Sequence, residues 1–362
     1  MNRRLALLFL ALVAALTACS TPPPEATTTA EPLKVGFVYS GPIGDVGWTY
    51  QHELGRQRVE KELGSRVKTV FVENVPESAD AERVIRQLVS DGCGMIFTTS
   101  FGFMEPTVKV AREFPKVVFE HATGYKTTAN LGVYQSKFYE GAYLLGIIAG
   151  KMTKTGTLGY VGSFSIPEVL RNVNAWTMGA RSVNPNVKTE VIWINSWYDP
   201  PREKEAAETL INQGADVLYQ NTDSPAIVQA AEAKGLHAFG QDSDMAKYGP
   251  KAELTANVVN WGGYYVKKVK DVLEGKWKSE DTKWGMAEGM IEVMPLNAAV
   301  PPEVSRLFDE KKAAIQGGTL HPFSGPVLDQ SGATKVAAGA TIAEKELWSL
   351  NWYVQGIDGK LP

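Results

Sequence analysis

The chain has 362 residues, and its 37 Lys and Arg nearly balance its 40 Asp and Glu, for a formal net charge of −3. This mild acidity, without any cluster of Lys or Arg, argues against nucleic acid as the partner. A chain of this length exceeds what one hydrophobic core usually serves, so we expect two lobes.

The first nineteen residues have the pattern of an export signal. Arg3 and Arg4 precede the apolar run LALLFLALVAAL, and LTAC ends at Cys19. The run is shorter than the about 20 residues that cross a bilayer, so residues 1–19 are interpreted as a signal peptide. The small residues before Cys19 indicate a lipobox, in which Cys19 is acylated and becomes the mature N-terminus. The alternative is an ordinary signal with a chance cysteine. Loss of the two arginines would change the net charge from −3 to −5.

The next segment, residues 20–33, is rich in Pro, Thr and Ala and predicts a flexible tether. Cys93 is the other cysteine, and with Cys19 acylated we expect neither a disulfide nor a thiolate metal site. No later apolar run reaches membrane-spanning length. We therefore expect an extracytoplasmic protein anchored to the membrane by its N-terminal lipid, in the periplasm or on the outer face of the cytoplasmic membrane.

After the tether, short β-branched or aromatic runs alternate with amphipathic stretches that often end in Gly. The expected strands are 34–39, 68–73, 95–99, 117–120, 158–162, 189–194, 216–220 and 237–240. This alternation predicts an α/β protein with parallel sheets covered on both faces. Segments 81–101 and 203–223 repeat the order helix, Gly, strand, polar loop, which favours two lobes of one architecture. Right-handed crossovers then make each lobe a doubly wound sheet.

Ligands of such sheets bind beyond the carboxyl ends of the strands, and the loops there carry carboxylates and aromatic rings but few cations. The candidate ligand-binding residues are Asp45, Trp48, Phe101, Glu120, Trp197, Asp223 and Asp242. An aromatic face stacks a planar ring, and a carboxylate accepts hydrogen bonds from N–H groups or vicinal hydroxyls. The loops therefore predict a flat, neutral, donor-rich ligand and disfavour phosphates.

The turn GPIGDVG raises the question of a dinucleotide site. Its glycines, Gly41, Gly44 and Gly47, are spaced G-x-x-G-x-x-G and lack the close pair that approaches a pyrophosphate. Asp45 would also face the phosphates. We therefore do not expect a dinucleotide cofactor, or any other cofactor.

Catalytic and metal signals are weak. The four histidines have no H-x-x-x-H or H-E-x-x-H spacing, and the chain has no G-x-S-x-G elbow. His121 beside Glu120 is the best acid–base pair available, and a hydrogen-bonding role is favoured for it. Asp242 and Asp244 lack a third ligand nearby, so no metal site is expected.

Several blocks then occur in a fixed order. They are DVGWTYQHELG (45–55), FYEGAYLLGIIAGKMTKTGTLGYVG (138–162), SWYDP (196–200), GADVLYQNTDS (214–224) and FGQDSDM (239–245). From about Lys34 to Gly318 the chain resembles the basic membrane lipoprotein family, whose best understood branch binds purine nucleosides for ABC importers with a type I periplasmic-binding-protein fold. The resemblance implies that Trp48 stacks a base and that Asp242 holds ribose hydroxyls.

The chain also departs from the family pattern. Ala122 replaces an aspartate after the fourth strand, so Glu120 or His121 is the expected substitute, and the usual lysine is absent from LTANVVNWGG (254–263). The stacking residue is Trp instead of Phe. These departures suggest a sub-branch similar to members thought to take adenine or related purines.

The resemblance also implies a lobe arrangement. The first lobe is expected to contain 34–149 and 262–305, and the second 150–261 and 306–362, with a C-terminal tail that spans the hinge.

The expected mechanism is closure of the hinge around a purine, which creates a surface for an ABC permease. Trp48 would stack the base and Trp197 or Phe101 would cover its other face. Asp45 and Asp223 would accept its protons. The alternatives are a receptor of the same fold for a sugar or an autoinducer, and an exported nucleoside hydrolase.

Overall fold

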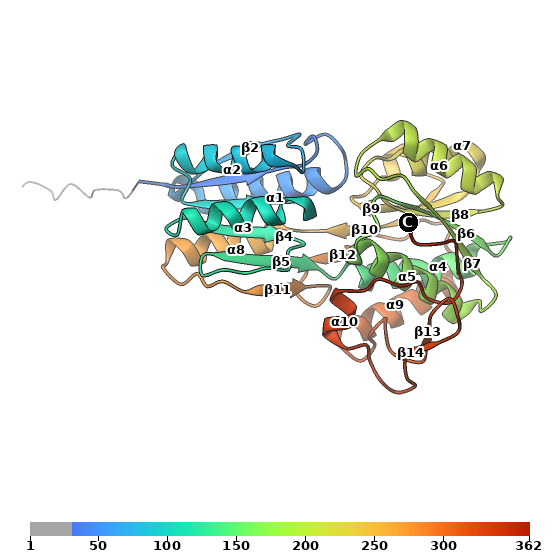
Figure 1. Ribbon diagram of the computed structural model, residues 1–362. Helices are drawn as coiled ribbons and strands as arrows, with labels where there is room; N and C mark the ends of the chain where they lie inside the picture. Colours follow the sequence, from blue (N-terminus) through green and yellow to red (C-terminus); the bar gives the residue numbers. More distant parts are fainter. Residues whose placement is uncertain (1–30) are drawn as a thin grey trace, which may run out of the picture. The chain divides into compact units, whose positions relative to one another are not determined.

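Two largely parallel β-sheets, each covered by helices on both faces, make up the part of the chain that the computed structural model describes, residues 31–362 (Figure 1). The expected signal peptide, Cys19 and most of the expected tether lie outside the described residues. Residues 33–362 form one compact unit, whose first strand already begins at Leu33. The predicted α/β class with two doubly wound lobes is confirmed.

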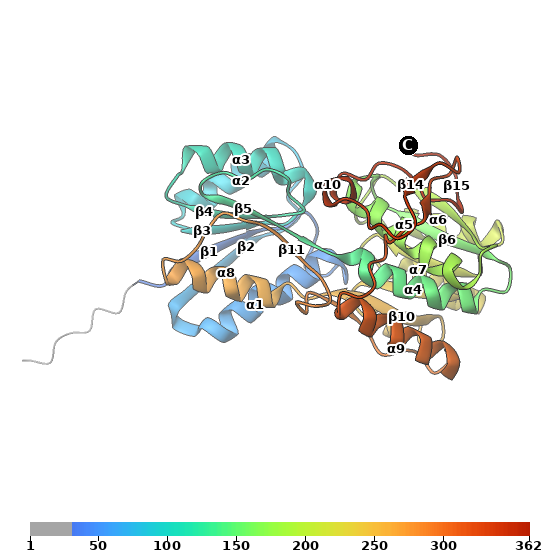
Figure 2. The same ribbon diagram turned by 90° about the horizontal axis from the view of Figure 1, so that it is seen from below.

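The sheet of the first lobe has the strand order β11-β5-β4-β3-β1-β2, with all neighbours parallel. Its strands are β1 (Leu33–Val38), β2 (Val67–Val72), β3 (Met95–Thr98), β4 (Val118–Ala122), β5 (Leu131–Ser136) and β11 (Asp281–Trp284). One pair of helices covers each face, as Figure 2 shows. The pairs are α1 (Trp48–Leu63) with α8 (Gly262–Leu273), and α2 (Ala79–Ser90) with α3 (Met104–Glu113).

The sheet of the second lobe has the order β12-β10-β9-β8-β6-β7-β15, in which only β12 is antiparallel to its neighbour. Its strands are β6 (Thr157–Gly162), β7 (Lys188–Trp193), β8 (Val217–Asn221), β9 (His237–Asp242), β10 (Glu253–Val259), β12 (Ile291–Val293) and β15 (Ile357–Asp358). The helices are α4 (Phe138–Met152), α5 (Pro167–Val183) and α9 (Pro302–Gln316) on one face, and α6 (Pro200–Asn212) and α7 (Ala226–Lys234) on the other.

Helix ends follow local sequence signals. Asp199 caps α6 by accepting a hydrogen bond from the backbone N–H of Arg202 at 3.2 Å, and prolines begin α5 and α6. Gly235 ends α7 in the left-handed conformation. Because these signals are local, the alternation of strands and helices is readable from the sequence.

The chain passes between the lobes three times, after β5, after β10 and after β11. Two expected boundaries are wrong. Residues 138–149 belong to α4, which packs against α5 and α9 of the second lobe, and β12 and the start of α9 also lie there. The physical reason is that α4 is apolar on nearly all sides and needs neighbours on both flanks, which the first lobe does not supply.

The C-terminal segment contains the hairpin β13 (Val327–Leu328) and β14 (Thr334–Val336), and the short helix α10 (Glu344–Trp348). It contacts both lobes: Glu344 accepts from Lys283 of β11 at 3.1 Å, and the carbonyl of Leu347 accepts from Arg171 of α5 at 3.3 Å. None of the helices within residues 31–362 is long and apolar enough to cross a membrane.

The α4–α5 contact depends on glycine. A Cβ at Gly146 would overlap the carbonyl oxygen of Trp176, and a Cβ at Gly179 would overlap that of Tyr143. We expect Gly146→Ala to lower the free energy of unfolding by about 1–3 kcal/mol in urea denaturation, because the added methyl group forces the helices apart. Gly263→Ala is the control, since its Cβ meets nothing within 4 Å. Equal losses in both variants would contradict this account of the contact.

Candidate functional site

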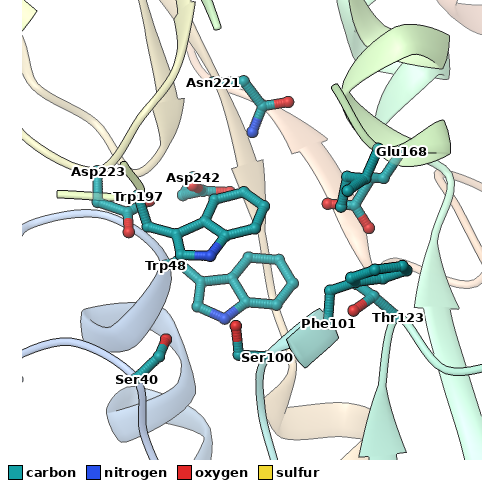
Figure 3. A pocket seen from close by; sticks show the side chains of 11 residues that line it. Ser40, Trp48, Ser100, Phe101, Thr123, Glu168, Trp197, Asn221, Asp223 and Asp242 are labelled. Carbon is teal, nitrogen blue, oxygen red and sulfur yellow. The ribbon is translucent and has the colours of Figure 1, made fainter. Parts of the chain in front are cut away.

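A small cavity lies between the carboxyl ends of the two sheets (Figure 3). It is lined from the first lobe by Ser40, Trp48, Ser100, Phe101 and Thr123, and from the second lobe by Ile166, Glu168, Trp197, Asn221, Asp223 and Asp242. Most of these residues end a strand or follow one directly, which is where a doubly wound sheet places ligand contacts. Five of the seven predicted residues therefore share one cavity: Trp48, Phe101, Trp197, Asp223 and Asp242.

Two indole rings from opposite lobes project into the cavity, with Phe101 beside them (Figure 3). Trp48, the first residue of α1, donates from Nε1 to the carbonyl oxygen of Thr99 at 2.5 Å and lies edge-on to His52 at 4.6 Å. Trp197, before α6, packs on Phe164 at 4.9 Å. Trp48 therefore lines the cavity with its polar edge already bonded to the protein, so what it offers a ligand is apolar ring surface.

Glu77 of the first lobe holds Trp197 from across the cleft. Its Oε2 accepts from Trp197 Nε1 at 3.2 Å, and its Oε1 accepts from the Gly102 backbone at 2.9 Å and from the Ser100 hydroxyl. Ser100 and Gly102 flank Phe101. One carboxylate thus fixes both Trp197 and the loop that presents Phe101.

The lobes also touch at the N-terminus of α1. A Cβ at Gly47 would lie 2.6 Å from Cα and from the carbonyl oxygen of Asp223, so only Gly fits there. Gln51 Nε2 donates to Ser243 Oγ of the second lobe at 2.8 Å. The backbone N–H of Trp48 donates to the Asp223 carboxylate. These contacts describe a closed cleft in which a helix N-terminus faces a carboxylate.

Asp45 does not line this cavity. Its carboxylate accepts from the backbone N–H groups of Gly47 and Thr49 at 2.9 Å and of Tyr50 at 3.0 Å, which would otherwise be unpaired at the start of α1. The expectation that Asp45 accepts protons of the ligand is therefore corrected: Asp45 caps the helix that carries Trp48.

Glu120 and His121 do not line the cavity either. Glu120 is buried under α8, where Oε2 accepts from Tyr264 Oη at 2.6 Å, Oε1 accepts from Trp277 Nε1 at 2.8 Å, and Lys268 Nζ lies 3.5 Å away. His121 Nδ1 is paired with Thr98 Oγ1 at 2.8 Å. The reason is that β4 continues to Ala122, two residues beyond its expected end, so both side chains lie inside the lobe. The lining residue after β4 is Thr123.

Three buried carboxylates line the cavity, and no Lys, Arg or His within residues 31–362 does. Burial is the main cause that raises the pKa of each of them. The pKa of Glu168 rises to about 7 although Arg171 opposes the rise, and the pKa of Asp223 rises further through Asp45 and Asp242. Asp242, at φ 65° at the end of β9, has its pKa raised by burial and by Glu168. Such a site offers buried carboxyl groups as hydrogen-bond partners and, among the described residues, no positive charge to bind an anion.

Several lining residues were not among the predicted ones. The polar residues of this group are Ser40, Ser100, Thr123, Glu168 and Asn221 (Figure 3). Asn221 ends a strand that was predicted one residue short, so its position was within reach of the sequence. Glu168 follows Pro167 at the start of α5, a signal for a helix start that says nothing about the direction of the side chain.

The buried position of His121 inside the first lobe gives a testable prediction. We expect its imidazole to stay neutral between pH 5 and 8, because burial lowers its pKa to about 3. Nitrogen-15 NMR of the histidine rings across this range measures the titration directly. Titration of His121 near the ordinary pKa of about 6.5 would instead indicate that its ring is exposed to solvent in the cleft, where it could act as an acid–base group.

Comparisons with known proteins agree with this architecture. The family model described as "ABC transporter substrate-binding protein PnrA-like" matches residues 33–319. A purine-binding protein of Brucella abortus (strain 2308) is 50% identical over 332 residues, which cover 92% of this chain and 95% of that protein. A putative ABC transporter glucose-binding protein of Haloferax volcanii is 36% identical, covering 92% of this chain and 82% of that one.

Solved structures show the same fold. An ABC transporter solute-binding protein from Aeropyrum pernix K1 superposes with a TM-score of 0.70 at 23% identity, over 80% of this chain and 93% of that one. With the match of the family model along most of the described residues, the chain belongs to the Bmp family of PnrA-like ABC transporter substrate-binding proteins.

Proposed function

We propose that the protein is a lipid-anchored, extracytoplasmic receptor of an ABC importer that binds a purine base or purine nucleoside between its lobes. The observation that carries the proposal is a cavity with indole rings from both lobes, three buried carboxylates and, in the described part of the chain, no cationic lining residue. A planar heterocycle stacks on the indoles while its N–H groups donate to the carboxylates. The name of the 50% identical relative, a purine-binding protein, supports the same ligand class.

Each lining residue has a proposed role in binding. Trp48 stacks the base from the first lobe, and Trp197 or Phe101 covers its other face. Asp223 accepts a base N–H at the point where α1 meets the second lobe, and Asp242 accepts from ribose hydroxyls when the ligand is a nucleoside. Closure shapes the surface that a membrane permease recognises. Acylated Cys19 would hold the protein at the membrane.

A sugar receptor is the second candidate, because the 36% identical relative is named as a putative glucose-binding protein. Aromatic faces and carboxylates also suit a sugar ring and its hydroxyls. Isothermal titration calorimetry with adenine, adenosine and glucose separates the two candidates. Binding of glucose alone would refute the purine proposal. Adenosine recovered unchanged after incubation would agree with a transport role, and release of free adenine would indicate a hydrolase.

The stacking role of Trp48 gives a quantitative expectation. We expect Trp48→Ala to weaken adenine binding roughly 5- to 150-fold, because stacking on an aromatic ring contributes about 1–3 kcal/mol. Calorimetric titration of the purified variant measures the loss. Trp48→Phe keeps an aromatic face and should retain most of the affinity. Unchanged binding by Trp48→Ala would show that the ligand does not lie on this ring.

Closure gives a second expectation. We expect Gly47→Ala to weaken adenine binding by roughly 5- to 150-fold, because the added Cβ would lie 2.6 Å from Asp223 and costs about 1–3 kcal/mol in the closed form only. Gly44→Ala in the same turn is the control, since its Cβ meets nothing within 4 Å. If both variants bind like the wild type, this closed contact is not part of the bound state.

A further inference from the structure

Glu168 is a lining carboxylate with a buried oxygen atom that accepts no hydrogen bond from the described residues. Only 6% of its surface is exposed, its side chain points into the cavity (Figure 3), and its Oε2 has no hydrogen-bond partner within residues 31–362. Asp242, by contrast, accepts from Gln241 Nε2 at 3.0 Å, and Asp223 accepts from the N-terminus of α1. A buried polar atom without a partner is costly, so Glu168 requires a partner from the ligand.

Arg171 is the cation of the described residues that acts on Glu168, and its own hydrogen bonds go to other groups. Arg171, one turn along α5, donates to the carbonyl of Leu347 and to Gln135 Oε1, both at 3.3 Å, and stacks over Trp348 at 4.2 Å. Arg171 and Glu168 form no salt bridge among the ion pairs of the described residues. Arg171 therefore stabilises the ionised form of Glu168 by a coulombic interaction without a direct ion pair.

Burial is the cause that favours the neutral form of Glu168, and the other titratable groups around it are buried as well. Asp242 faces it from β9, Asp223 lines the same cavity after β8, and the phenol of Tyr160 lies behind it on β6. The first lobe presents Phe101 and Thr123, neither of which ionises at neutral pH. Burial of Glu168, which leaves only 6% of its surface exposed, therefore outweighs the opposing charge of Arg171. In an open cleft Glu168 would be hydrated and ionised at neutral pH.

We infer that Glu168 binds the edge of the bound base as a neutral carboxylic acid, so that the cleft selects an edge with an acceptor nitrogen beside an amino group, as in adenine, and takes up a proton when it closes. This inference rests on the proposed purine-binding function and specifies its ligand class.

The hydrogen-bond chemistry explains the selection. A neutral carboxyl group presents an O–H donor beside a C=O acceptor, which matches the N7 acceptor and the N6 amino donor of adenine with two bonds. Guanine presents two acceptors, N7 and O6, on that edge. An ionised carboxylate only accepts, and it suits two adjacent donors, such as the N1–H and N2 amino groups of guanine. The protonation state of Glu168 therefore decides which edge of a purine it can pair with, and on the N7 edge it distinguishes adenine from guanine.

The sign of the pH dependence follows from linkage. Closure raises the pKa of Glu168 from its ordinary value of about 4.3 to about 7, so the closed complex binds more protons than the open protein between these values. Adenine affinity should therefore fall by up to tenfold per pH unit as the pH rises toward 7, and flatten above it.

Calorimetric titration of the mature protein with adenine from pH 5.5 to 8 tests the inference. Glu168→Gln keeps a donor beside an acceptor, so it should retain adenine binding and lose the Glu168 part of the pH dependence. Glu168→Leu should lose at least tenfold in affinity at pH 5.5. Titrations in buffers of different ionisation enthalpy should show up to one proton more taken up by the wild type than by Glu168→Gln.

Glu253→Gln is the matched control, because Glu253 also lies buried in the second lobe with its pKa raised to about 8 by burial, but outside the cavity. It should leave the slope unchanged. Equal slopes in the wild type and Glu168→Gln, or guanine affinity that exceeds that of adenine and rises with pH, would overturn the inference while the purine receptor stands. Failure of the wild type to bind any purine at any pH would instead refute the proposed function.

Discussion

The central constraint on this molecule is the burial of three carboxylates in one small cavity that no Lys, Arg or His of the described residues lines. Removing Glu168, Asp223 and Asp242 from water is unfavourable unless each is neutralised or accepts hydrogen bonds. The N-terminus of α1 supplies part of this compensation to Asp223, and under the proposed function the rest comes from protonation of Glu168 and from a ligand rich in N–H or O–H donors. The same constraint disfavours phosphates and other anions.

The burial of the carboxylates depends on closure of the two lobes, and this dependence links ligand binding to closure. The carboxylates belong to the second lobe, whereas Trp48 and the helix N-terminus that meets Asp223 belong to the first. The complete site therefore exists only while the lobes are together. Glu77 and Gln51 add hydrogen bonds across the cleft, which couple the position of Trp197 to closure. A ligand that pairs with both sides stabilises the closed form by its differential affinity for it.

Much of the fold was readable from the sequence, because eight of the strands are apolar runs bounded by turns or helix stops. The strands β5 and β10 escaped notice because polar side chains such as Gln135, Thr255 and Asn257 interrupt their apolar pattern. All three are nonetheless buried, since tertiary contacts satisfy them. The lobe assignment of α4 was wrong because a helix that is apolar on nearly all sides fits either lobe equally well in sequence.

Fewer of the site residues than of the strands could be predicted from the sequence. Residues directly after strands were placed well, but Glu120 was not, since a two-residue extension of β4 moves it into the core. Asp45 precedes a helix, and its capping role could have been recognised from that position. Glu168 gave no signal, because the direction of a side chain on the first turn of a helix depends on how α5 packs against the rest of the lobe.

The most direct test of the account is a crystal structure of the protein with the ligand that it retains through purification. The account predicts a purine ring stacked on Trp48, with its donors directed to the carboxylates of the second lobe. A sugar or a phosphorylated molecule in the cavity, or Trp48 turned away from an occupied cleft, would contradict it.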